Sequence, residues 1–520
     1  MFREALEKGE FVITVELVPG RGVSGPALEA PAAFARRVRE TGLGVHAISL
    51  TDGPGGGPAI QPDALAAEVA AEGMDALVHL ACRDLNRNAF EARASALARR
   101  GLPHVLALTG DYPTAPSGTI ARPVFDFDSV QAISFLKACN AGLEVPGRKP
   151  GTMERLPATK FFVGAAISPF KTREDELVPQ FAKMEKKLAA GADFLVTQLG
   201  YDLRRFHEVL RYLRARRLRV PVLGNVYVLS AGAARTMRRG EVPGAVVTER
   251  LLRMLEAEAQ APDKGRGARL ERAARMVAVL KGMGFNGVHL GGFGLKFDDV
   301  QFILRRAEEG AAQWESFVPE IQFADEGEVY LFPPPATYRP DAPPDSDALQ
   351  DRRGGSAGLF YRMMRLCHRA LFREGAFGYR AMRGFYRAID GVEPLKRVGH
   401  AAEFGVKRLL FGCRDCGDCA LPDTAYHCPE SNCPKGQRNG PCGGSRDGRC
   451  EVFPDRPCLW TVIYRRWKAM GEWETSRCRR LPPRDPKLQD TSGWANFYLD
   501  RDYRRRVIED AATSPVPAQD

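Results

Sequence analysis

The sequence predicts an α/β fold: a (β/α)8 TIM barrel followed by a small cysteine-rich metal-binding domain. Three observations predict it. Short apolar runs alternate with amphipathic helical stretches up to about residue 308. Eight strands, each followed by a helix, over about 300 residues are the count and size of such a barrel. A proline-rich segment then follows, and nine of the twelve cysteines come after residue 400.

The eight expected strands are short and largely apolar. Between them, stretches such as ELVPQFAKMEKKLAAG repeat apolar residues three and four positions apart, which is typical of helices with one buried face. A doubly wound open sheet is the alternative, but no glycine-rich dinucleotide turn follows the first strand. The strands are expected at Val12–Glu16, Val45–Leu50, Ala76–Leu80, His104–Leu108, Phe161–Ala165, Phe194–Thr197, Val220–Gly224 and Gly287–Leu290.

Composition changes along the chain suggest where its parts divide. Proline, glycine and aspartate are enriched between about residues 320 and 356, as in a linker. The expected parts are a barrel over 1–312, a linker over 313–356, an Arg-rich helical segment over 357–400, a cysteine-rich domain over 401–505 and a disordered tail over 506–520.

Bulk properties narrow the function classes. The N-terminus, MFREALEKGEFVITVELVPG, lacks the apolar core of a secretory signal, and no run of eighteen uncharged apolar residues occurs. We therefore expect a cytoplasmic protein with reduced thiols and no membrane partner. Much of the net charge of +11 is arginine scattered through the last third, without a nucleic-acid-binding motif. We therefore expect no nucleic-acid partner.

Chemistry in such barrels is carried by residues at the carboxyl ends of the strands. Two of the carboxylates, a histidine and a glutamine lie on four different strand ends, a combination that chance explains poorly. The polar residues expected there are Glu16, Thr51, Asp52, His79, Thr109, Asp111 and Gln198.

In order and spacing, this set resembles the methylenetetrahydrofolate reductases. The resemblance covers roughly residues 10–308 and is carried by Glu16 in VELVP, Thr51 in LTDGP, His79 in HLACRD, Asp111 in LTGD and Gln198 in TQ. It implies a flavin-bearing barrel that reduces 5,10-methylenetetrahydrofolate to 5-methyltetrahydrofolate in one-carbon and methionine metabolism.

The resemblance also implies roles for individual residues. Glu16 and Asp111 would be catalytic, with Glu16 as the general acid. Asp111 would also contact both substrate and flavin, and Gln198 would bind the pterin. The flavin, FAD or else FMN, would be contacted by Thr51, His79, Asp111 and Lys187. Because the acid must keep its proton near neutral pH, we expect burial to raise the pKa of Glu16.

Two departures leave the electron donor open. Thr109 stands where many relatives carry arginine, and the eighth strand, GVHLGGFGL, lacks the Asn-Arg ending of nicotinamide-using members. The donor is therefore NAD(P)H or a ferredoxin-like iron–sulfur protein. We also expect a homo-oligomer.

The cysteine-rich region supplies candidate metal ligands. Its C-x2-C-x2-C opening, followed by a Cys-Pro pair, is similar to a ferredoxin run, although the last gap is eight residues. Zinc would use the same thiolates, so an iron–sulfur cluster and zinc both stay open. We expect the first three cysteines and either Cys428 or Cys433 to bind one cluster. The candidate ligands are Cys413, Cys416, Cys419, Cys428, Cys433, Cys442, Cys450 and Cys458.

The same block carries a second resemblance and leaves two alternatives. CRDCGDCALPDTAYHCPESNCPK followed by RNGPCGG resembles the cysteine-rich C-terminal domain of certain bacterial methylenetetrahydrofolate reductases. One alternative is a zinc-dependent methyltransferase on a barrel, for which only Cys82 sits at a strand end. The other is a cysteine-rich electron-transfer or docking module joined to the barrel.

Overall fold

The structure, a computed structural model, describes residues 1–114, 121–340 and 357–505 in two compact units. The first unit comprises Met1–Asp351 together with the short segment Cys442–Asp447, and the second comprises Arg352–Pro441 and Gly448–Asp520. No helix among the described residues is long and apolar enough to cross a membrane.

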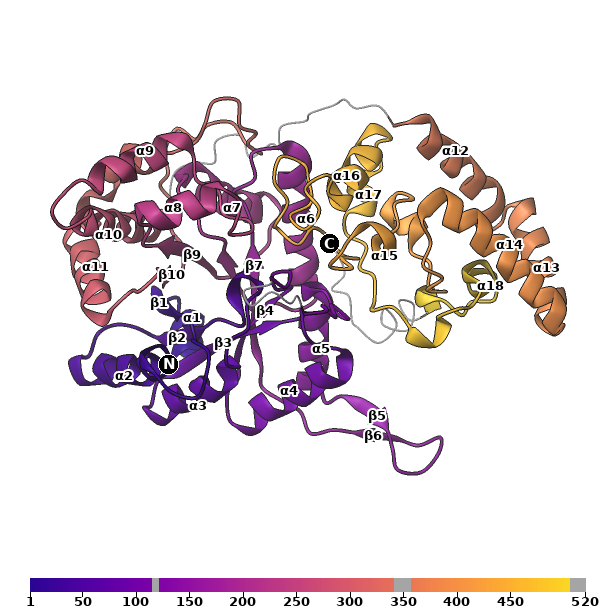
Figure 1. The fold of residues 1–520 in the computed structure, drawn as a ribbon, viewed down its shortest axis with the longest axis horizontal. Helices are drawn as coiled ribbons and strands as arrows, with labels where there is room; N and C mark the ends of the chain where they lie inside the picture. The colour runs from indigo at the N-terminus through magenta and orange to yellow at the C-terminus, as the bar shows by residue number, and fades with distance from the viewer. Residues whose placement is uncertain (115–120, 341–356, 506–520) are drawn as a thin grey trace. The chain divides into compact units, whose positions relative to one another are not determined.

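The first unit is a closed parallel barrel, as the sequence predicts. All eight expected strands are present, with ends shifted by up to three residues, in the ring order β1-β10-β9-β8-β7-β4-β3-β2 (Figure 1). The doubly wound alternative is excluded because the pairing of β1 with β10 closes the ring and leaves it without an edge strand. The barrel strands are β1 (Val12–Leu17), β2 (Ala47–Leu50), β3 (Asp75–Ala81), β4 (His104–Leu108), β7 (Phe162–Ile167), β8 (Phe194–Thr197), β9 (Val222–Tyr227) and β10 (Gly287–Gly291).

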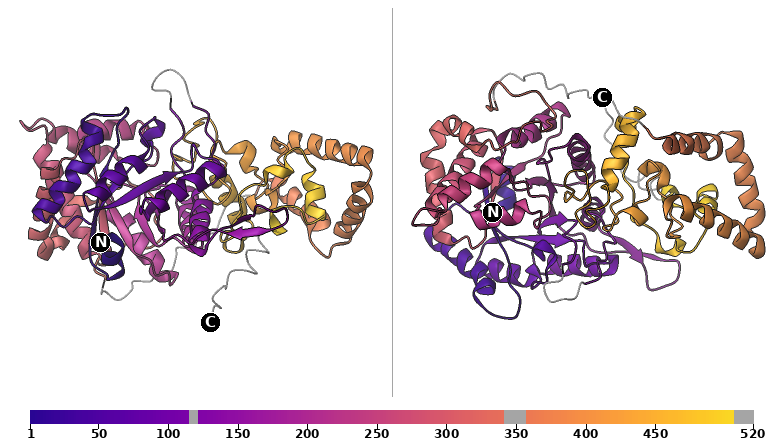
Figure 2. Two further views of the ribbon diagram at one scale, coloured as in Figure 1. Left: turned by 90° about the horizontal axis from the view of Figure 1, so that it is seen from below. Right: turned by 45° about the horizontal axis from the view of Figure 1, so that its top comes forward.

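Helices surround the strands, as the further views show (Figure 2). Their apolar faces pack on the barrel, and several begin at a side-chain cap. Asp128, for example, accepts hydrogen bonds from two backbone N–H groups in a capping box. The helices are α1 (Phe2–Glu7), α2 (Pro26–Thr41), α3 (Pro62–Ala71), α4 (Arg87–Arg99), α5 (Ser129–Ala141), α6 (Glu174–Ala189), α7 (Leu203–Ala215), α8 (Ala231–Arg238), α9 (Glu249–Glu258), α10 (Arg266–Gly282) and α11 (Phe297–Glu309).

Helix α1 closes the amino-terminal end of the barrel. Phe2 is fully buried, and its ring meets those of Phe162 and Phe194 edge-on, with centroids 5.9 and 5.3 Å away. The backbone N–H of Phe2 donates to Asp75 at 2.7 Å. A side chain at Gly164 would collide with the Phe194 ring, so this layer has no spare room. The carboxyl end therefore remains as the place for a site.

One hairpin and one extended segment add to the barrel. The hairpin, β5 (Glu144–Pro146) with β6 (Met153–Arg155), is largely exposed and is not expected from the sequence. After the short helix η2 (Ala311–Ile321), the chain runs along α7, where Arg204 donates to the Phe332 carbonyl at 2.7 Å. Residues 341–356 of the expected linker, and the expected tail at 506–520, lie outside the described residues.

The second unit is built from helices and cysteine-bearing loops. A long pair of helices, α13 and α14, lies on one side of this unit (Figure 1). The aromatic residues Tyr379 and Tyr386 of α13 pack against Tyr498 of α18. The elements are α12 (Leu359–Cys367), η3 (His368–Phe372), α13 (Phe377–Asp390), α14 (Glu393–Phe411), η4 (Leu421–Thr424), α15 (Pro429–Asn432), α16 (Leu459–Ala469), α17 (Trp473–Ser476), η5 (Pro486–Leu488) and α18 (Gly493–Tyr498).

A buried ion network fixes the loop after β2. Arg93, buried in α4, donates to Asp52 at 2.7 Å and to Asp63 at 2.6 Å. Asp52 also accepts from the Ala81 N–H at 3.0 Å. Asp52 is thus held by structural contacts at the strand ends. Removing one member of such a network leaves buried charges without partners.

We expect Arg93→Met to destabilise the barrel by about 3–5 kcal/mol, because two carboxylates lose their buried cation. Unfolding of the full chain followed by circular dichroism measures this. The matched variant Arg36→Met, which removes an exposed pair with Glu72, should change the transition little. Equal shifts for both variants would contradict the structural role of Arg93.

Candidate active site and cysteine centres

The strand-end residues meet at the carboxyl end of the barrel. Ligand atoms of Glu16 on β1, His79 on β3 and His289 on β10 all lie within 4.8 Å of one another. The two histidine rings stack with centroids 6.1 Å apart. Three strands distant in sequence therefore supply one cluster of titratable groups.

Glu16 and His289 form a hydrogen-bonded chain with Thr14. The Nε2 atom of His289 lies 3.2 Å from a Glu16 carboxylate oxygen, and its Nδ1 atom lies 2.8 Å from the Thr14 hydroxyl. Thr14 and His289 are buried, whereas the Glu16 side chain is 21% exposed. This order of groups can pass a proton from the barrel interior to Glu16 at the mouth.

The expected pKa shift of Glu16 is wrong for the protein without substrate. Burial by itself raises the pKa of Glu16, but the hydrogen bond and charge of His289, together with the charge of His79, lower it below its ordinary value. The apolar strand indicates burial of Glu16, but the two histidines reach it from other strands. Glu16 is therefore ionised near neutral pH in this state.

His79 is neutral near neutral pH. Burial lowers the pKa of His79 to about 4, although the charge of Glu16 opposes that shift. Its Nε2 atom lies 2.9 Å from the Ser49 hydroxyl, which orients the ring. A neutral imidazole can donate or accept one hydrogen bond without adding charge to the site.

Asp111 connects the loops after β2 and β4. Its carboxylate accepts from the Gly55 N–H at 2.8 Å, and Thr114 N–H donates to the Gly56 carbonyl at 3.1 Å. Gly56 has a φ of 75°, and a Cβ there would lie 2.0 Å from the Tyr112 carbonyl oxygen. Only glycine allows this close approach, which holds Asp111 at the mouth of the barrel.

Lys187 is a buried residue rather than a surface lysine. Its Nζ donates to the Ala166 carbonyl at 2.6 Å, at the carboxyl half of β7. Burial first, and then the charge of Lys183, lowers the pKa of Lys187 to about 7. A buried ammonium with this pKa gains stability from an anion placed beside it.

The remaining expected residues occupy different surroundings. The Thr51 hydroxyl is buried and has no hydrogen-bond partner among the described residues. Thr109 is buried with its hydroxyl 3.4 Å from that of Ser129. Gln198, after β8, accepts from the N–H of Leu199 at 2.9 Å. The unused Thr51 hydroxyl is a polar group that a ligand could satisfy.

Cys82 does not offer a zinc-binding thiolate. It is fully buried, and burial raises the pKa of its thiol well above the ordinary value. A zinc methyltransferase needs thiolate ligands at the barrel mouth, and no other cysteine follows a barrel strand among the described residues. The barrel therefore gives no support to that alternative.

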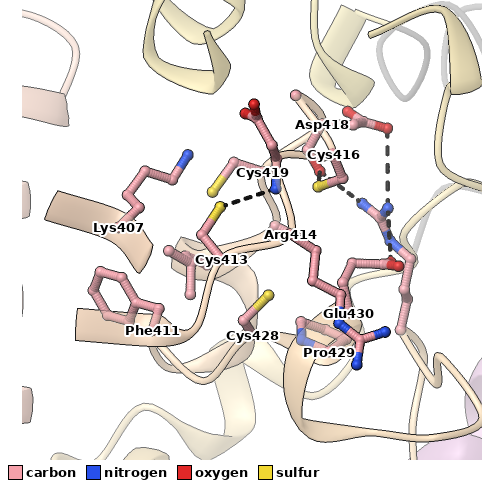
Figure 3. A pocket seen from close by; sticks show the side chains of 15 residues that line it. Lys407, Phe411, Cys413, Arg414, Cys416, Asp418, Cys419, Cys428, Pro429 and Glu430 are labelled. Carbon is pink, nitrogen blue, oxygen red and sulfur yellow. Dashed lines mark hydrogen bonds and ion pairs between the residues drawn. The ribbon is translucent and has the colours of Figure 1, made fainter. Parts of the chain in front are cut away.

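In the second unit, four cysteines face one pocket. The sulfur atoms of Cys413, Cys416, Cys419 and Cys428 converge on a common space (Figure 3). The first three lie on the loop after α14, and Cys428 caps α15. Burial raises the pKa of Cys416 to about 12, so without a metal its thiol stays neutral. Metal binding would replace such protons.

The spacing of these sulfurs is wider than a single zinc ion requires. Four thiolates about 2.3 Å from a tetrahedral zinc lie about 3.8 Å apart. Among the described residues, no three cysteine sulfurs lie within 4.8 Å of one another. In this structure the sulfurs therefore lie farther apart than the ligands of one tetrahedral zinc ion.

Two buried cations border the same pocket. Lys407 donates to Glu403 at 2.7 Å, and the nearby Cys419 together with Glu403 raises its pKa despite burial. Arg438 is 4% exposed, and its Nε and Nη1 atoms make no hydrogen bond within the described residues. These positive charges would offset the negative charge of a metal–thiolate centre.

A second cysteine group is separate from the first. Cys433 ends α15, Cys458 precedes α16, and Cys450 lies in the turn between Gly448 and Cys458. Burial, followed by the charge of Cys433, raises the pKa of Cys458 to about 12, and Cys450 adds to this. Cys433 therefore lies with Cys450 and Cys458, whereas Cys428 lies with the first group. Cys442 belongs to the segment of the first unit.

The sequence alone does not identify several residues of the site. His289 was visible in GVHLGG, but nothing in that strand predicts that it faces Glu16. Thr14 reads as an ordinary strand residue, and Lys407 and Arg438 read as surface cations. The available signal was the position of His289 on the strand that pairs with β1 when the barrel closes.

The fold and site define a (β/α)8 barrel with an acid–histidine cluster at its mouth and an appended cysteine-rich unit. The family model described as methylenetetrahydrofolate reductase matches residues 1–296. A second model, described as methylene-tetrahydrofolate reductase C terminal, matches residues 394–487. Because the first match covers more than half of the chain, the protein belongs to the methylenetetrahydrofolate reductase family.

The remaining comparisons find only distant similarities. None of the curated proteins matches the chain. An uncharacterized protein from Clostridium thermocellum, described as binding two copies of 5-methyl-5,6,7,8-tetrahydrofolic acid, aligns over 60% of this chain and 99% of its own at 10% identity, with a TM-score of 0.42. Tryptophan synthase from M. tuberculosis aligns over 60% and 96% at 14% identity, with a TM-score of 0.32.

We expect the two cysteine groups to lose metal independently, because they lie in different places. Cys416→Ser should remove the metal of the first group and spare that of the second, and Cys458→Ser should do the reverse. Iron and zinc analysis of anaerobically purified full-length protein measures this. Cys478→Ser, at an exposed cysteine, is the control. Loss of all metal in either single variant would show that the groups form one centre.

Proposed function

We propose that the protein reduces 5,10-methylenetetrahydrofolate to 5-methyltetrahydrofolate with a flavin bound at the barrel mouth. The observation that carries this proposal is the Glu16–His289–Thr14 chain at the strand ends of a barrel of this family. The reaction adds two electrons and two protons to the folate. A bound flavin would supply the hydride, and the chain's residues would supply protonation and charge stabilisation.

Glu16 acts as the general acid on N10 of the folate. A folate over the barrel mouth would remove the remaining exposure of Glu16, and this further burial raises its pKa. The carboxyl can then hold the proton that opens the five-membered ring. His289 stands behind Glu16 and can return a proton to it through their hydrogen bond. Thr14 fixes the orientation of the histidine ring.

Asp111 and Gln198 position the substrate. The ring-opened folate carries positive charge, and a carboxylate held by the Gly55 N–H can stabilise that charge without reorganising. The Gln198 amide, next to β8, would hydrogen-bond the pterin. Both roles follow from the family resemblance and from their strand-end positions.

The residues present fit a flavin. Within the part of the chain that the structure describes, the buried Thr51 hydroxyl has no hydrogen-bond partner, and the neutral ring of His79 offers a hydrogen bond without charge. Lys187 is a buried cation suited to a flavin phosphate, as either FAD or FMN. Asp111 lies at the same mouth and would help set the flavin potential.

The first cysteine group would hold an iron–sulfur cluster. Its four converging sulfurs, their wide spacing and the bordering cations Lys407 and Arg438 support this over a single zinc ion. Cys433, Cys450 and Cys458 would form a second centre, for which zinc is an alternative. A cluster on the same chain as the barrel fits a donor that delivers electrons one at a time, and NAD(P)H stays the other candidate donor.

Glu16→Gln should keep the flavin and its reduction by dithionite but lower folate turnover by about 10²–10⁴-fold, since the acid is lost. Anaerobic stopped-flow measurements separate the two half-reactions. Glu16→Asp, which keeps a carboxyl, should recover part of the rate. Folate reduction by Glu16→Gln at the normal rate would refute the assignment.

Flavin affinity should fall as the pH rises above about 7, where free Lys187 loses its proton. A bound phosphate raises that pKa, so binding above this pH takes up a proton and costs up to about tenfold in affinity per pH unit. Fluorescence titration of flavin-free protein measures the profile. Lys187→Met should flatten it, whereas Lys160→Met, at an exposed site, should leave it unchanged. A flat wild-type profile would contradict this role.

A further inference from the structure

The helices before the cysteine loops carry most of the chain's excess positive charge. We call residues 359–411, which comprise α12, η3, α13 and α14, the helical arm (Figure 1). It contains eleven Lys and Arg against four Asp and Glu, a net charge of +7 in a chain whose total is +11. The arm therefore presents a concentrated positive field to its surroundings.

Only part of the arm is buried against the rest of its unit. Helix α13 packs through Tyr379, Tyr386 and Ile389 on the aromatic cluster of α18. Helix α14 buries Glu403 and Lys407, which face the loop before α18 and the cysteine pocket. Much of the remaining surface of these helices is exposed among the described residues.

The uncovered faces are apolar as well as basic. On α14, Leu395, Val398, Val406 and Leu409 are 51%, 66%, 48% and 86% exposed. Their spacing of three residues, or of multiples of four, places them along one side of the helix. Phe377, on α13, is 82% exposed. Apolar stripes of this extent on a soluble protein commonly mark interaction surfaces.

The C-terminal end of α14 leads to the first cysteine group, which lies across the helix from the apolar stripe. Lys407 and Phe411 of α14 line the pocket that holds the four sulfurs, and Cys413 follows the helix by two residues (Figure 3). Leu409 lies between these two lining residues in the sequence. A protein seated on the exposed side of α14 would therefore lie close to the cysteine centre.

We propose that the exposed side of the helical arm is the docking surface for an acidic one-electron carrier protein. The inference rests on the proposed metal centre, because the carrier would deliver its electron there. Each reduced carrier is oxidised by one electron, so two docking events supply the two electrons of one folate reduction, and the two protons come from solvent. Charge complementarity favours an acidic partner.

Two other occupants fit less well. A second copy of the chain would bring another net charge of +7 against the same surface, which opposes pairing through this face. An anionic membrane would match the charge, but it gives no reason for a cysteine centre at the C-terminal end of α14. Sedimentation and vesicle binding distinguish these two occupants from a carrier protein.

Arg397 and Leu409 provide the test variants, each with a matched control. Arg397 is 79% exposed and pairs with Glu393 one turn earlier, and Arg253 on α9 is 74% exposed and pairs with Glu249 in the same way. Arg397→Glu is therefore compared with Arg253→Glu. Leu409→Ser is compared with Met153→Ser, a substitution at a 63% exposed residue of the β6 hairpin.

The probe is an acidic bacterial-type ferredoxin with a [4Fe–4S] cluster, titrated against the full-length protein by calorimetry at low and high salt. We expect binding that weakens with salt, and about tenfold weaker binding for Arg397→Glu and for Leu409→Ser. Both controls should match the wild type. Oxidation of the reduced ferredoxin by the protein, followed in the visible spectrum, should slow in the same variants.

Several results would overturn the proposal. Equal binding by test and control variants would remove the arm from the interface. A dimer in sedimentation that Leu409→Ser dissociates would identify a second copy as the occupant. Tight binding to anionic phosphatidylglycerol vesicles without ferredoxin binding would identify a membrane. Metal analysis separates the two proposals, because zinc without iron would refute the cluster while the ferredoxin titration still tests the surface.

Discussion

The pairing of β1 with β10 is the interaction on which the candidate active site depends. It closes the barrel in a register that sets Thr14 opposite His289 and Val15 opposite Leu290. Glu16 and Gly291 come next on the two strands, and a Cβ on Gly291 would lie 3.2 Å from a Glu16 carboxylate oxygen. A shift by one residue would turn His289 to the opposite face and leave Glu16 without its partner. The strand pairing that closes the barrel therefore also brings Glu16 and His289 together.

Packing at the two ends of the barrel holds the β1–β10 strand pair in place. At the amino end, Phe2 fills the layer beneath the strands with its ring against Phe162 and Phe194. At the carboxyl end, Arg93 holds Asp52 in the loop after β2, and the following turn meets the loop that carries Asp111. The apolar layer gives a rigid floor, and the buried ions give loops of fixed shape. Preorganised positions of this kind are what electrostatic stabilisation of a reacting group requires.

The cysteine-rich unit is organised around buried thiols and not around a closed sheet. Its short helices and loops bury thiols whose pKa values lie above normal, as at Cys416 and Cys458. The buried cations Lys407 and Arg438 pair with carboxylates at distances from 2.7 to 4.0 Å, and they also border the neutral thiols of the pocket. A bound metal centre would convert the thiols to thiolates and neutralise those cations. Folding of this unit and loading of its metal are therefore expected to be coupled.

The sequence by itself determined the barrel, its eight strands and the identity of most strand-end residues, because a two-residue and a 3.6-residue period are local properties. It also located the cysteines, since their spacing is read directly. The sequence missed the β5–β6 hairpin, which is short, polar and exposed. Only the tertiary structure decided that His289 lowers the pKa of Glu16, that Lys187 is buried, and that Cys428 rather than Cys433 joins the first group. Those outcomes depend on contacts between segments far apart in the chain, and burial and Coulomb terms between such segments cannot be evaluated until the strands close and the loops pack.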